Sequence, residues 1–187
     1  MTEREEKKPR LLLHCCCAPD ATAVYERLAR DYEVVCYWYN PNIQPAEEFH
    51  KRLAAMRQLA EIVGMELVID ESGEDQWAEA VRGLEDEPEG GKRCDVCFAM
   101  RLQKAAQKAK ELGCEYLAST LTVSPHKPAA KINPCGEAAA EGTGVKFLDE
   151  DFKAQDGFKR SVELAKQHGL YRQNYCGCSY SARLTSL

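Results

Sequence analysis

The sequence predicts an α/β protein in which a parallel sheet of about five strands is covered by helices on both faces. Short apolar or β-branched runs alternate along the chain with longer segments of helical periodicity, an order typical of a parallel sheet. The length of 187 residues suits one domain with a substantial core, and no Gly-, Ser- or Pro-rich linker divides it. We therefore expect a charged tail at residues 1–10 and a single domain at residues 11–187.

The order of the elements follows from these patterns. The expected strands are the aliphatic, β-branched or aromatic runs at 11–13, 34–39, 65–69, 116–123 and 145–148. The expected helices are the segments with apolar residues at helical spacing, one beginning near Asp20 and the others at 47–64, 76–84, 98–112 and 157–168. Between residues 124 and 144 we expect a loop and one short helix.

Three adjacent cysteines, Cys15, Cys16 and Cys17, lie where the first strand passes into the first helix. Pro19 and Asp20 favour a helix start, and Asp20 is expected to cap free N–H groups there. Because ligands of open α/β sheets bind at the carboxyl ends of strands, this junction is the expected site. A helix N-terminus also favours the thiolates that bind metal. Strand alternation points Cys15 away from Cys16, which makes Cys15 the less secure ligand.

A second pair of thiols, Cys94 and Cys97, precedes the long helix expected from residue 98. Their spacing lets one helical turn point both sulfurs at a single metal. It suits zinc, an iron–sulfur cluster or a thioredoxin-like dithiol. The neighbouring Arg93 is expected to lower the thiol pKa in each case.

A third pair, Cys176 and Cys178, lies in the C-terminal segment. Gly177 between them allows the sharp backbone turn that would bring both sulfurs to one site. Aromatic residues flank this segment on both sides, namely Tyr171, Tyr175 and Tyr180. We therefore expect the tail to pack against the body of the protein.

Together the three groups offer six thiols, with the Asp20 carboxylate beside them. A single zinc ion or one cubane cluster takes roughly four protein ligands. The surplus predicts two metal centres, or a cluster with an additional metal beside it. Cys36, Cys114 and Cys135 have no partners at ligand spacing, and we expect them to be ordinary apolar residues.

The composition narrows the function classes. Ten cysteines in a chain with no evident signal peptide or membrane span predict metal or redox chemistry in the cytoplasm. The net charge of −5 argues against indiscriminate nucleic-acid binding, so an RNA partner would have to meet a local basic patch. The sequence has neither a G-x-x-x-x-G-K-[ST] phosphate loop nor a G-x-G-x-x-G turn, and its first strand-to-helix turn lacks the Ser-Gly-Gly loop of ATP pyrophosphatases. We expect electron chemistry rather than nucleotide activation.

Four ordered motifs resemble those of QueH-type epoxyqueuosine reductases. They are His14-Cys15-Cys16-Cys17-Ala18-Pro19-Asp20, Tyr39-Asn40-Pro41-Asn42-Ile43, Arg93-Cys94-Asp95-Val96-Cys97 with Arg101-Leu102, and Tyr171-Arg172-Gln173-Asn174-Tyr175-Cys176-Gly177-Cys178. The likeness runs from Leu11 to Ser181. It implies a Rossmann-like, HUP-like domain that carries a [4Fe-4S] cluster and an adjacent mononuclear iron. It also implies removal of the epoxide oxygen from epoxyqueuosine in a tRNA anticodon stem-loop, without cobalamin and with a ferredoxin or flavodoxin as electron donor.

Under this resemblance, the expected metal ligands divide into two groups. Cys17, Cys94, Cys97 and Asp20 are expected on the cluster, and Cys16, Cys176 and Cys178 on the second iron. Some members of the family have a further cysteine where this chain has Asp20. The residues expected to take part directly in the reaction are Cys16, Cys176, Cys178 and Asp20.

Further polar residues are candidates for contacts with the substrate. Those expected near the modified base or its sugar-like ring are Asn40, Asn42, Arg52, Tyr175 and Ser124. His14 and His126 are candidate proton donors, with a structural histidine as the alternative. Arg101, Lys104 and Lys108 are spaced to share one helix face, which would either meet phosphates or be solvated.

Two rival functions remain open at this point. One is a binding module stabilised by zinc, and the other is a dithiol oxidoreductase that uses Cys94 and Cys97.

Overall fold

The computed structural model describes residues 7–184. Five strands form one sheet in the order β3-β2-β1-β4-β5, and all of their pairings are parallel. The strands are β1 (Arg10–Cys15), β2 (Glu33–Tyr39), β3 (Glu66–Asp70), β4 (Tyr116–Ser119) and β5 (Lys146–Phe147). The predicted α/β fold with a parallel sheet is confirmed.

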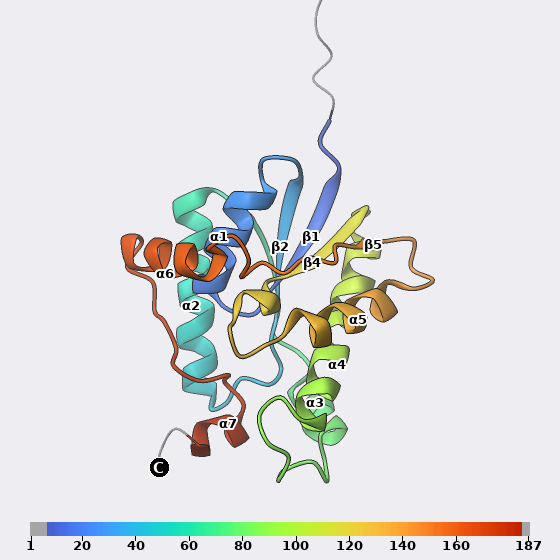
Figure 1. Ribbon diagram of the computed structural model, residues 1–187, viewed down its shortest axis with the longest axis vertical. Helices are drawn as coiled ribbons and strands as arrows, with labels where there is room; N and C mark the ends of the chain where they lie inside the picture. The colour runs from blue at the N-terminus through green and yellow to red at the C-terminus, as the bar shows by residue number, and fades with distance from the viewer. Residues whose placement is uncertain (1–6, 185–187) are drawn as a thin grey trace, which may run out of the picture.

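Helices cover both faces of this sheet (Figure 1). On one face lie α1 (Ala18–Leu28), α2 (Ala46–Val63) and α6 (Gly157–Gln167). On the other face lie α4 (Lys92–Glu111) and α5 (Ala129–Ala140). The remaining short helices are α3 (Glu74–Ala80), the 3-10 helix η1 (Thr120–Val123) and α7 (Ser179–Leu184).

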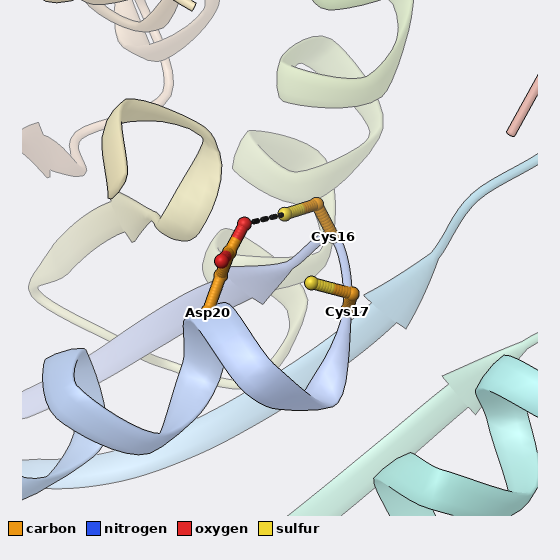
Figure 2. Close-up of side chains that lie close together, drawn as sticks. All are labelled: Cys16, Cys17 and Asp20. Atoms are coloured by element: carbon orange, nitrogen blue, oxygen red, sulfur yellow. Dashed lines mark hydrogen bonds between the residues drawn. The ribbon is translucent and has the colours of Figure 1, made fainter. Parts of the chain in front are cut away.

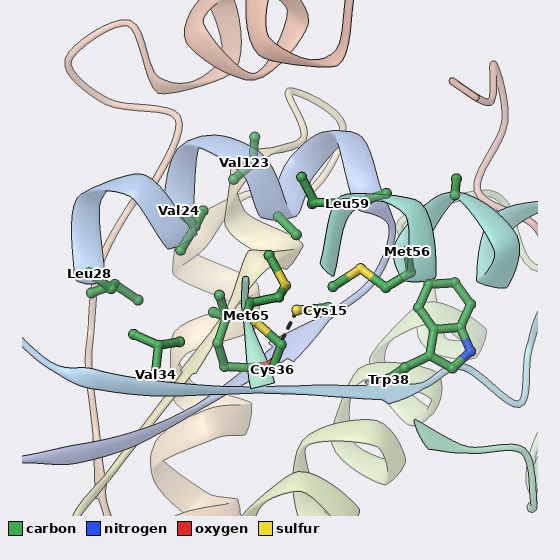
Figure 3. Close-up of a cluster of buried hydrophobic side chains, with 14 of the residues drawn as sticks. Cys15, Val24, Leu28, Val34, Cys36, Trp38, Met56, Leu59, Met65 and Val123 are labelled. Atoms are coloured by element: carbon green, nitrogen blue, oxygen red, sulfur yellow. Dashed lines mark hydrogen bonds between the residues drawn. The ribbon is translucent and has the colours of Figure 1, made fainter. Parts of the chain in front are cut away.

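Side chains alternate between the two faces along the central strands. Cys15 and Cys36 point into the larger core beneath α1 and α2, and Figure 3 shows the two side chains close together. Leu12 and Tyr37 point into the smaller core beneath α4. Cys16 belongs to neither core, because its side chain packs in a separate cluster beyond the end of β1. The predicted divergence of Cys15 from Cys16 is therefore confirmed.

The strand order reverses at β1, which pairs with β2 on one side and β4 on the other. Ligands of open α/β sheets bind at the carboxyl ends of strands at such a switch point. The loops that leave β1, β2 and β4 are joined there by hydrogen bonds. The Cys16 backbone N–H donates to Thr120 Oγ1 at 2.9 Å, and Asn40 Nδ2 donates to the Cys15 carbonyl at 3.0 Å.

Several element bounds differ from the predicted ones. The strand expected to reach residue 123 ends at Ser119, because the Ser119 side chain accepts a hydrogen bond from the Leu121 N–H and the chain turns into η1. α4 begins at Lys92, so Cys94 and Cys97 lie inside the helix rather than before it. The segment between residues 124 and 144 contains α5, a 12-residue helix with Pro134 in its interior.

The first strand also has different bounds from those predicted. β1 begins at Arg10, whose guanidinium donates to the Leu112 carbonyl at 2.7 Å and pairs with Glu33 and Glu66 at 3.3 and 3.1 Å. Residues 1–6 of the predicted tail lie outside the described residues. Among residues 7–184, no helix is both long and apolar enough to cross a membrane.

Candidate metal centre

Cys16, Cys17 and Asp20 present three possible metal ligands at the carboxyl end of β1. Their ligand atoms all lie within 4.8 Å of one another, and Figure 2 shows them facing a common space. Cys16 Sγ and Asp20 Oδ2 form a hydrogen bond of 3.5 Å. Cys17 is the N-cap of α1 and no side chain caps this helix, so the predicted capping role of Asp20 is wrong. Asp20 instead turns its carboxyl group to the thiols.

The two thiols differ in their electrostatic surroundings. The pKa of Cys16 is well below its ordinary value, because Cys17 donates a hydrogen bond to it and the charges of Lys127 and Arg101 add to this effect. The same hydrogen bond, together with burial, raises the pKa of Cys17. Cys16 alone of the two is favoured as a thiolate, and the causes are this hydrogen bond and the two cations rather than the helix start on which the prediction was based. Burial and the charge of Cys16 raise the pKa of Asp20 to about 8.

The first turns of α4 bring two further thiols to this region. Cys94 packs in the same apolar cluster as Cys16 and Cys17, and its sulfur accepts a hydrogen bond from the Gly90 N–H at 3.2 Å. Cys97 packs beside Cys178 in an adjoining cluster. Burial raises the pKa of Cys94 and raises that of Cys97 to about 11.

The charge of Arg93 lowers the pKa of Cys94 as predicted, but the net pKa of Cys94 is raised. Burial outweighs the charge of Arg93, which contributes only a smaller opposing effect. The guanidinium of Arg93 is itself buried and donates to the carbonyls of Leu84, Glu85 and Glu87 at 3.1, 3.0 and 2.5 Å. Arg93 therefore fixes the loop before α4.

The C-terminal segment is held against the body by Arg52. The Arg52 guanidinium donates to the carbonyls of Cys176 at 2.9 Å and Tyr175 at 3.2 Å, and it pairs with Glu48 at 2.7 Å. The Gln44 N–H donates to the Gly177 carbonyl at 2.8 Å. These contacts confirm the prediction of a packed tail.

Aromatic residues add to this attachment. Arg52 lies 4.9 Å from the ring centre of Tyr175, and Arg93 lies 4.8 Å from that of Tyr180. The Tyr171 hydroxyl donates to the Glu48 carboxylate at 2.9 Å.

Gly177 has a φ of 113°, in the region that favours glycine, which agrees with the predicted sharp turn between the tail cysteines. The charge of Cys176 contributes, after burial, to the raised pKa of Cys94, Cys97 and Cys178. The tail thiols therefore lie within electrostatic reach of the α4 thiols. Three segments far apart in sequence bring the six predicted thiols to one end of the sheet.

Two cations accompany the thiols, of which Arg101 is buried and Lys127 is partly buried. Arg101 is 2% exposed and donates to Asn40 Oδ1 at 2.5 Å. Burial lowers the pKa of Lys127, but the negative charges of Cys176, Cys16 and Asp20 outweigh burial and raise it overall. Sequence reasoning missed Lys127 as a site residue, because it lies in the aperiodic segment after η1.

A small cavity adjoins the cysteines and opens toward a larger cleft. The inner cavity has a volume of about 30 Å³ and is lined by Cys16, Asp20, Asn40, Asn42, Ile43, Arg52, Arg101, Lys127, Gln173, Tyr175 and Cys176. The outer cleft has a volume of about 490 Å³ and lies between the tail and the loop after η1. Asp20, Lys127, Gln173, Tyr175 and Cys176 line both spaces, so the outer cleft gives access to the thiols.

The predicted substrate contacts fall into two groups. Asn40, Asn42, Arg52 and Tyr175 line the inner cavity, and Ser124 lines the outer cleft. The polar groups of Asn40 and Arg52 are already occupied by protein partners.

The two candidate histidines also separate. His126 is exposed and lines the outer cleft. His14 is fully buried, and its ring bonds the Ser119 hydroxyl at 2.9 Å and the Tyr39 carbonyl at 3.2 Å. Burial lowers the pKa of His14 to about 3. It is therefore a neutral structural histidine.

The prediction that Arg101, Lys104 and Lys108 share one face of α4 is wrong for Arg101. Arg101 points inward to Asn40, while Lys104 and Lys108 lie on the partly exposed side and pair with Asp70 and Glu111 at 3.6 and 2.5 Å. A shared helical register therefore does not place these three cations on one surface.

The other cysteines behave as predicted. Cys36 is fully buried in the larger core and Cys114 is 5% exposed in the smaller one. Cys135 is partly buried against the cluster that holds Cys16.

Comparisons with known proteins agree with the motifs. The family model of epoxyqueuosine reductase QueH matches residues 11–184. The epoxyqueuosine reductase QueH of Streptococcus pyogenes serotype M1 is 40% identical, over 99% of this chain and 75% of that protein. The one of Thermotoga maritima is 38% identical, over 91% of this chain and 89% of that protein.

A solved structure shows a similar fold. It is the U34-tRNA thiolase NcsA from Methanococcus maripaludis with its [4Fe-4S] cluster. The TM-score is 0.61 at 15% identity, covering 94% of this chain and 62% of the thiolase chain. From its matched length and its ordered cysteine motifs, this chain belongs to the epoxyqueuosine reductase QueH family of oxidoreductases.

Proposed function

We propose that this protein removes the epoxide oxygen of epoxyqueuosine in a tRNA anticodon stem-loop and so forms queuosine. We further propose that its six clustered cysteines and Asp20 hold a [4Fe-4S] cluster and an adjacent mononuclear iron. The observation that carries the proposal is the meeting of three thiol pairs at the switch point, beside a cleft open to substrate.

The residues present fit an iron–sulfur group. Thiolates are the usual ligands of such clusters, and this end of the sheet gathers six cysteines without forming a disulfide among the described residues. The apolar side chains of Phe98, Leu102 and Leu121 pack around Cys16, Cys17 and Cys94. Lys127 and Arg101 supply positive charge that offsets the charge of the thiolates. The likeness to a thiolase solved with its [4Fe-4S] cluster supports the same choice of group.

We assign the ligands as the resemblance implies. Cys17, Cys94, Cys97 and Asp20 would hold the cluster, and Cys16, Cys176 and Cys178 the second iron. The grouping of Cys17 with Cys94 in one apolar cluster supports part of this division. The proximity of the ligand atoms of Cys16, Cys17 and Asp20 supports a role for all three in metal binding.

The overall reaction takes two electrons and two protons. Both carbon–oxygen bonds of the epoxide break, the oxygen leaves as water, and a carbon–carbon double bond forms between the two carbons that carried it. When bound, the iron–sulfur group supplies the electrons singly and a Lewis-acidic site for the oxygen, with a ferredoxin or flavodoxin as the external donor.

The chain itself prepares the site for this chemistry. Arg52 holds the tail over the cavity through its hydrogen bonds to the Cys176 and Tyr175 carbonyls and its contact with the Tyr175 ring. The pKa of Lys127 is raised, because the negative charges around it outweigh the effect of burial. Its Nζ therefore stays protonated beside Cys16 and Asp20. The outer cleft admits the modified nucleotide from the RNA.

The rival functions have less support. A dithiol oxidoreductase needs an exposed cysteine with a low pKa, whereas Cys97 is 6% exposed and burial raises its pKa to about 11. A closed zinc site takes four ligands and leaves the remaining thiols without a role.

Anaerobic purification tests the proposal. We expect a brown, oxygen-sensitive protein with sulfide and with iron in excess of one cubane. With a low-potential donor it should convert an epoxyqueuosine stem-loop to a product lighter by one oxygen atom, measured by mass spectrometry. A protein that holds only zinc or no metal, or that leaves the stem-loop unchanged, contradicts the proposal.

A further inference from the structure

Two amide side chains face the inner cavity, and the oxygen atom of each lacks a hydrogen-bond donor among the described residues. Asn42 follows β2 and is 1% exposed, and Gln173 lies in the tail. Asn42 Oδ1 and Gln173 Oε1 are both buried, and neither accepts a hydrogen bond from any residue in the part of the chain that the structure describes. Both residues line the inner cavity beside Cys16 and Asp20.

Asn40, in the same loop, provides a direct contrast. Its Nδ2 donates to the Cys15 carbonyl and its Oδ1 accepts from Arg101, so both ends of its amide are used within the protein. A buried amide oxygen left without a hydrogen-bond donor destabilises the folded protein. Two such oxygens on one cavity therefore indicate a ligand that supplies hydrogen-bond donors.

The sizes of the two spaces indicate how such a ligand enters. The inner cavity of about 30 Å³ admits a group the size of one hydroxyl or ammonium, whereas the outer cleft of about 490 Å³ admits a ring. Gln173 lines both spaces, so it marks the passage between them. A ring in the outer cleft can direct its donor groups inward to the two amide oxygens.

We propose that Asn42 and Gln173 form an acceptor pair that recognises hydroxyl or amine donors on the modified ring of the RNA substrate. This inference rests on the proposed function, because the epoxyqueuosine ring carries hydroxyl groups and is joined to the base through an amine. Carbonyl oxygens accept from both kinds of donor. The pair thus selects the modified nucleotide and holds its ring over the thiols.

Binding measurements with anaerobically purified protein test this pair without depending on turnover. The probes are two stem-loops of the same sequence, one with queuosine and one with guanosine at the modified position. Queuosine keeps the hydroxyl and amine donors and lacks the epoxide. We expect the parent protein to bind the queuosine stem-loop more tightly, and Asn42→Leu and Gln173→Leu each to lose about tenfold of that preference. Their affinity for the guanosine stem-loop should remain unchanged.

Three further variants separate recognition from packing. Asn42→Asp and Gln173→Glu keep an acceptor of similar size, and each should retain the preference that the Leu variants lose. Gln44→Leu is the matched control, because the Gln44 amide contacts Glu74 at the surface and does not line the inner cavity. Its preference should equal that of the parent.

The outcomes separate the two proposals. If the parent reduces the epoxyqueuosine stem-loop but the Leu variants keep the full preference for queuosine, the acceptor pair is overturned and the function stands. Loss of the preference in the Asp and Glu variants as well would assign these positions to packing and also overturn the pair. If the parent neither prefers queuosine nor reduces the epoxide, the proposed function fails with it.

Discussion

Cys15 and Cys16 are neighbours in the sequence, yet they occupy two different regions of the molecule. Cys15 is fully buried in the larger core, and burial beside Cys36 raises its pKa. Cys16 lies beyond the strand end, where Cys17, Lys127 and Arg101 lower its pKa. The two residues have the same side chain, but Cys15 has apolar surroundings whereas Cys16 lies beside cations. The difference shows that position relative to the switch point decides which cysteines gather at one end of the sheet, where we propose that the ligands lie.

The same comparison extends to the rest of the chain. Cys36 and Cys114, like Cys15, lie in the cores between the sheet and its helices. Cys176 and Cys178 lie beyond the sheet edge, with the other predicted ligand thiols. If the comparison is correct, substitutions in these two regions affect different properties. Those in the core should change stability, and those at the sheet edge should change metal content and turnover.

The largest effect is expected from Cys178→Ser. Loss of a proposed ligand of the second iron should reduce turnover by about 100-fold or more, while much of the cluster absorbance remains. Cys36→Ser and Cys114→Ser are the matched controls, because both replace buried thiols of the cores. They should lower the midpoint of unfolding and keep most of the activity per folded molecule. Equal, mild losses of activity in all three variants would remove the tail from the site.

A smaller effect is expected from Gly177→Ala, which tests whether the tail geometry matters. A Cβ at Gly177 would lie 2.7 Å from Arg52 Nη1, at a φ of 113° that other residues rarely adopt. We expect a loss of about 1–3 kcal/mol in stability and about a tenfold loss in turnover. Thermal unfolding and activity assays of the anaerobic protein measure both quantities.

Gly169→Ala provides the control for backbone strain alone. Gly169 has a φ of 61°, and an added Cβ would have no described atom within 4 Å. This variant should lose about 1 kcal/mol of stability and keep its turnover. If both variants keep full turnover, the position of the tail cysteines is not coupled to Arg52.

The sequence allowed the main parts of the site to be predicted, because each depends on local pattern. Cys16 and Cys17 follow a short apolar strand, and the Cys94/Cys97 spacing indicates one helical turn. The order of strands and helices predicts the parallel sheet that places these segments at one edge. The resemblance to a known family then predicted that the three thiol pairs belong to one site.

The remaining features depend on contacts between distant segments, which local pattern does not reveal. Lys127 approaches Cys16 only because the loop after η1 folds back over β1. Arg101 shares a helical register with Lys108, but only the tertiary structure shows that one points inward and the other outward. The sign of the pKa shift at Cys94 depends on burial, which outweighs its charged neighbour Arg93.

A comparison of the cations at the outer cleft with those on α4 tests where the RNA binds. Arg172 lines the outer cleft and lies 5.3 Å from the ring centre of Phe158, whereas Lys104 and Lys108 are paired with carboxylates away from the cleft. We expect Arg172→Gln to raise KM for the stem-loop by about threefold and to reduce its salt dependence. The double variant Lys104→Gln/Lys108→Gln should leave KM nearly unchanged. The reverse order would place the RNA on α4.

The smallest effect concerns Asp70, the last residue of β3, which lies at the same edge of the sheet but away from the switch point. Its carboxylate accepts hydrogen bonds from Tyr37 at 2.9 Å and from Ser72, and it pairs with Lys104 at 3.6 Å. Burial raises the pKa of Asp70, but these hydrogen bonds and the nearby Lys104 outweigh burial and lower it overall.

A lowered pKa means that the charged carboxylate stabilises the folded protein above its ordinary value of 3.8. This contribution is lost as the pH falls through the folded-state pKa. We therefore expect Asp70→Asn to reduce the free energy of unfolding by about 1 kcal/mol at pH 7. The difference from the parent should vanish once the pH lies below the lowered pKa, as measured by urea unfolding across the acid range. Turnover at pH 7 should not change, because Asp70 faces Tyr37 and Lys104 rather than the thiols. A loss of turnover without a loss of stability would extend the site along the sheet edge to β3.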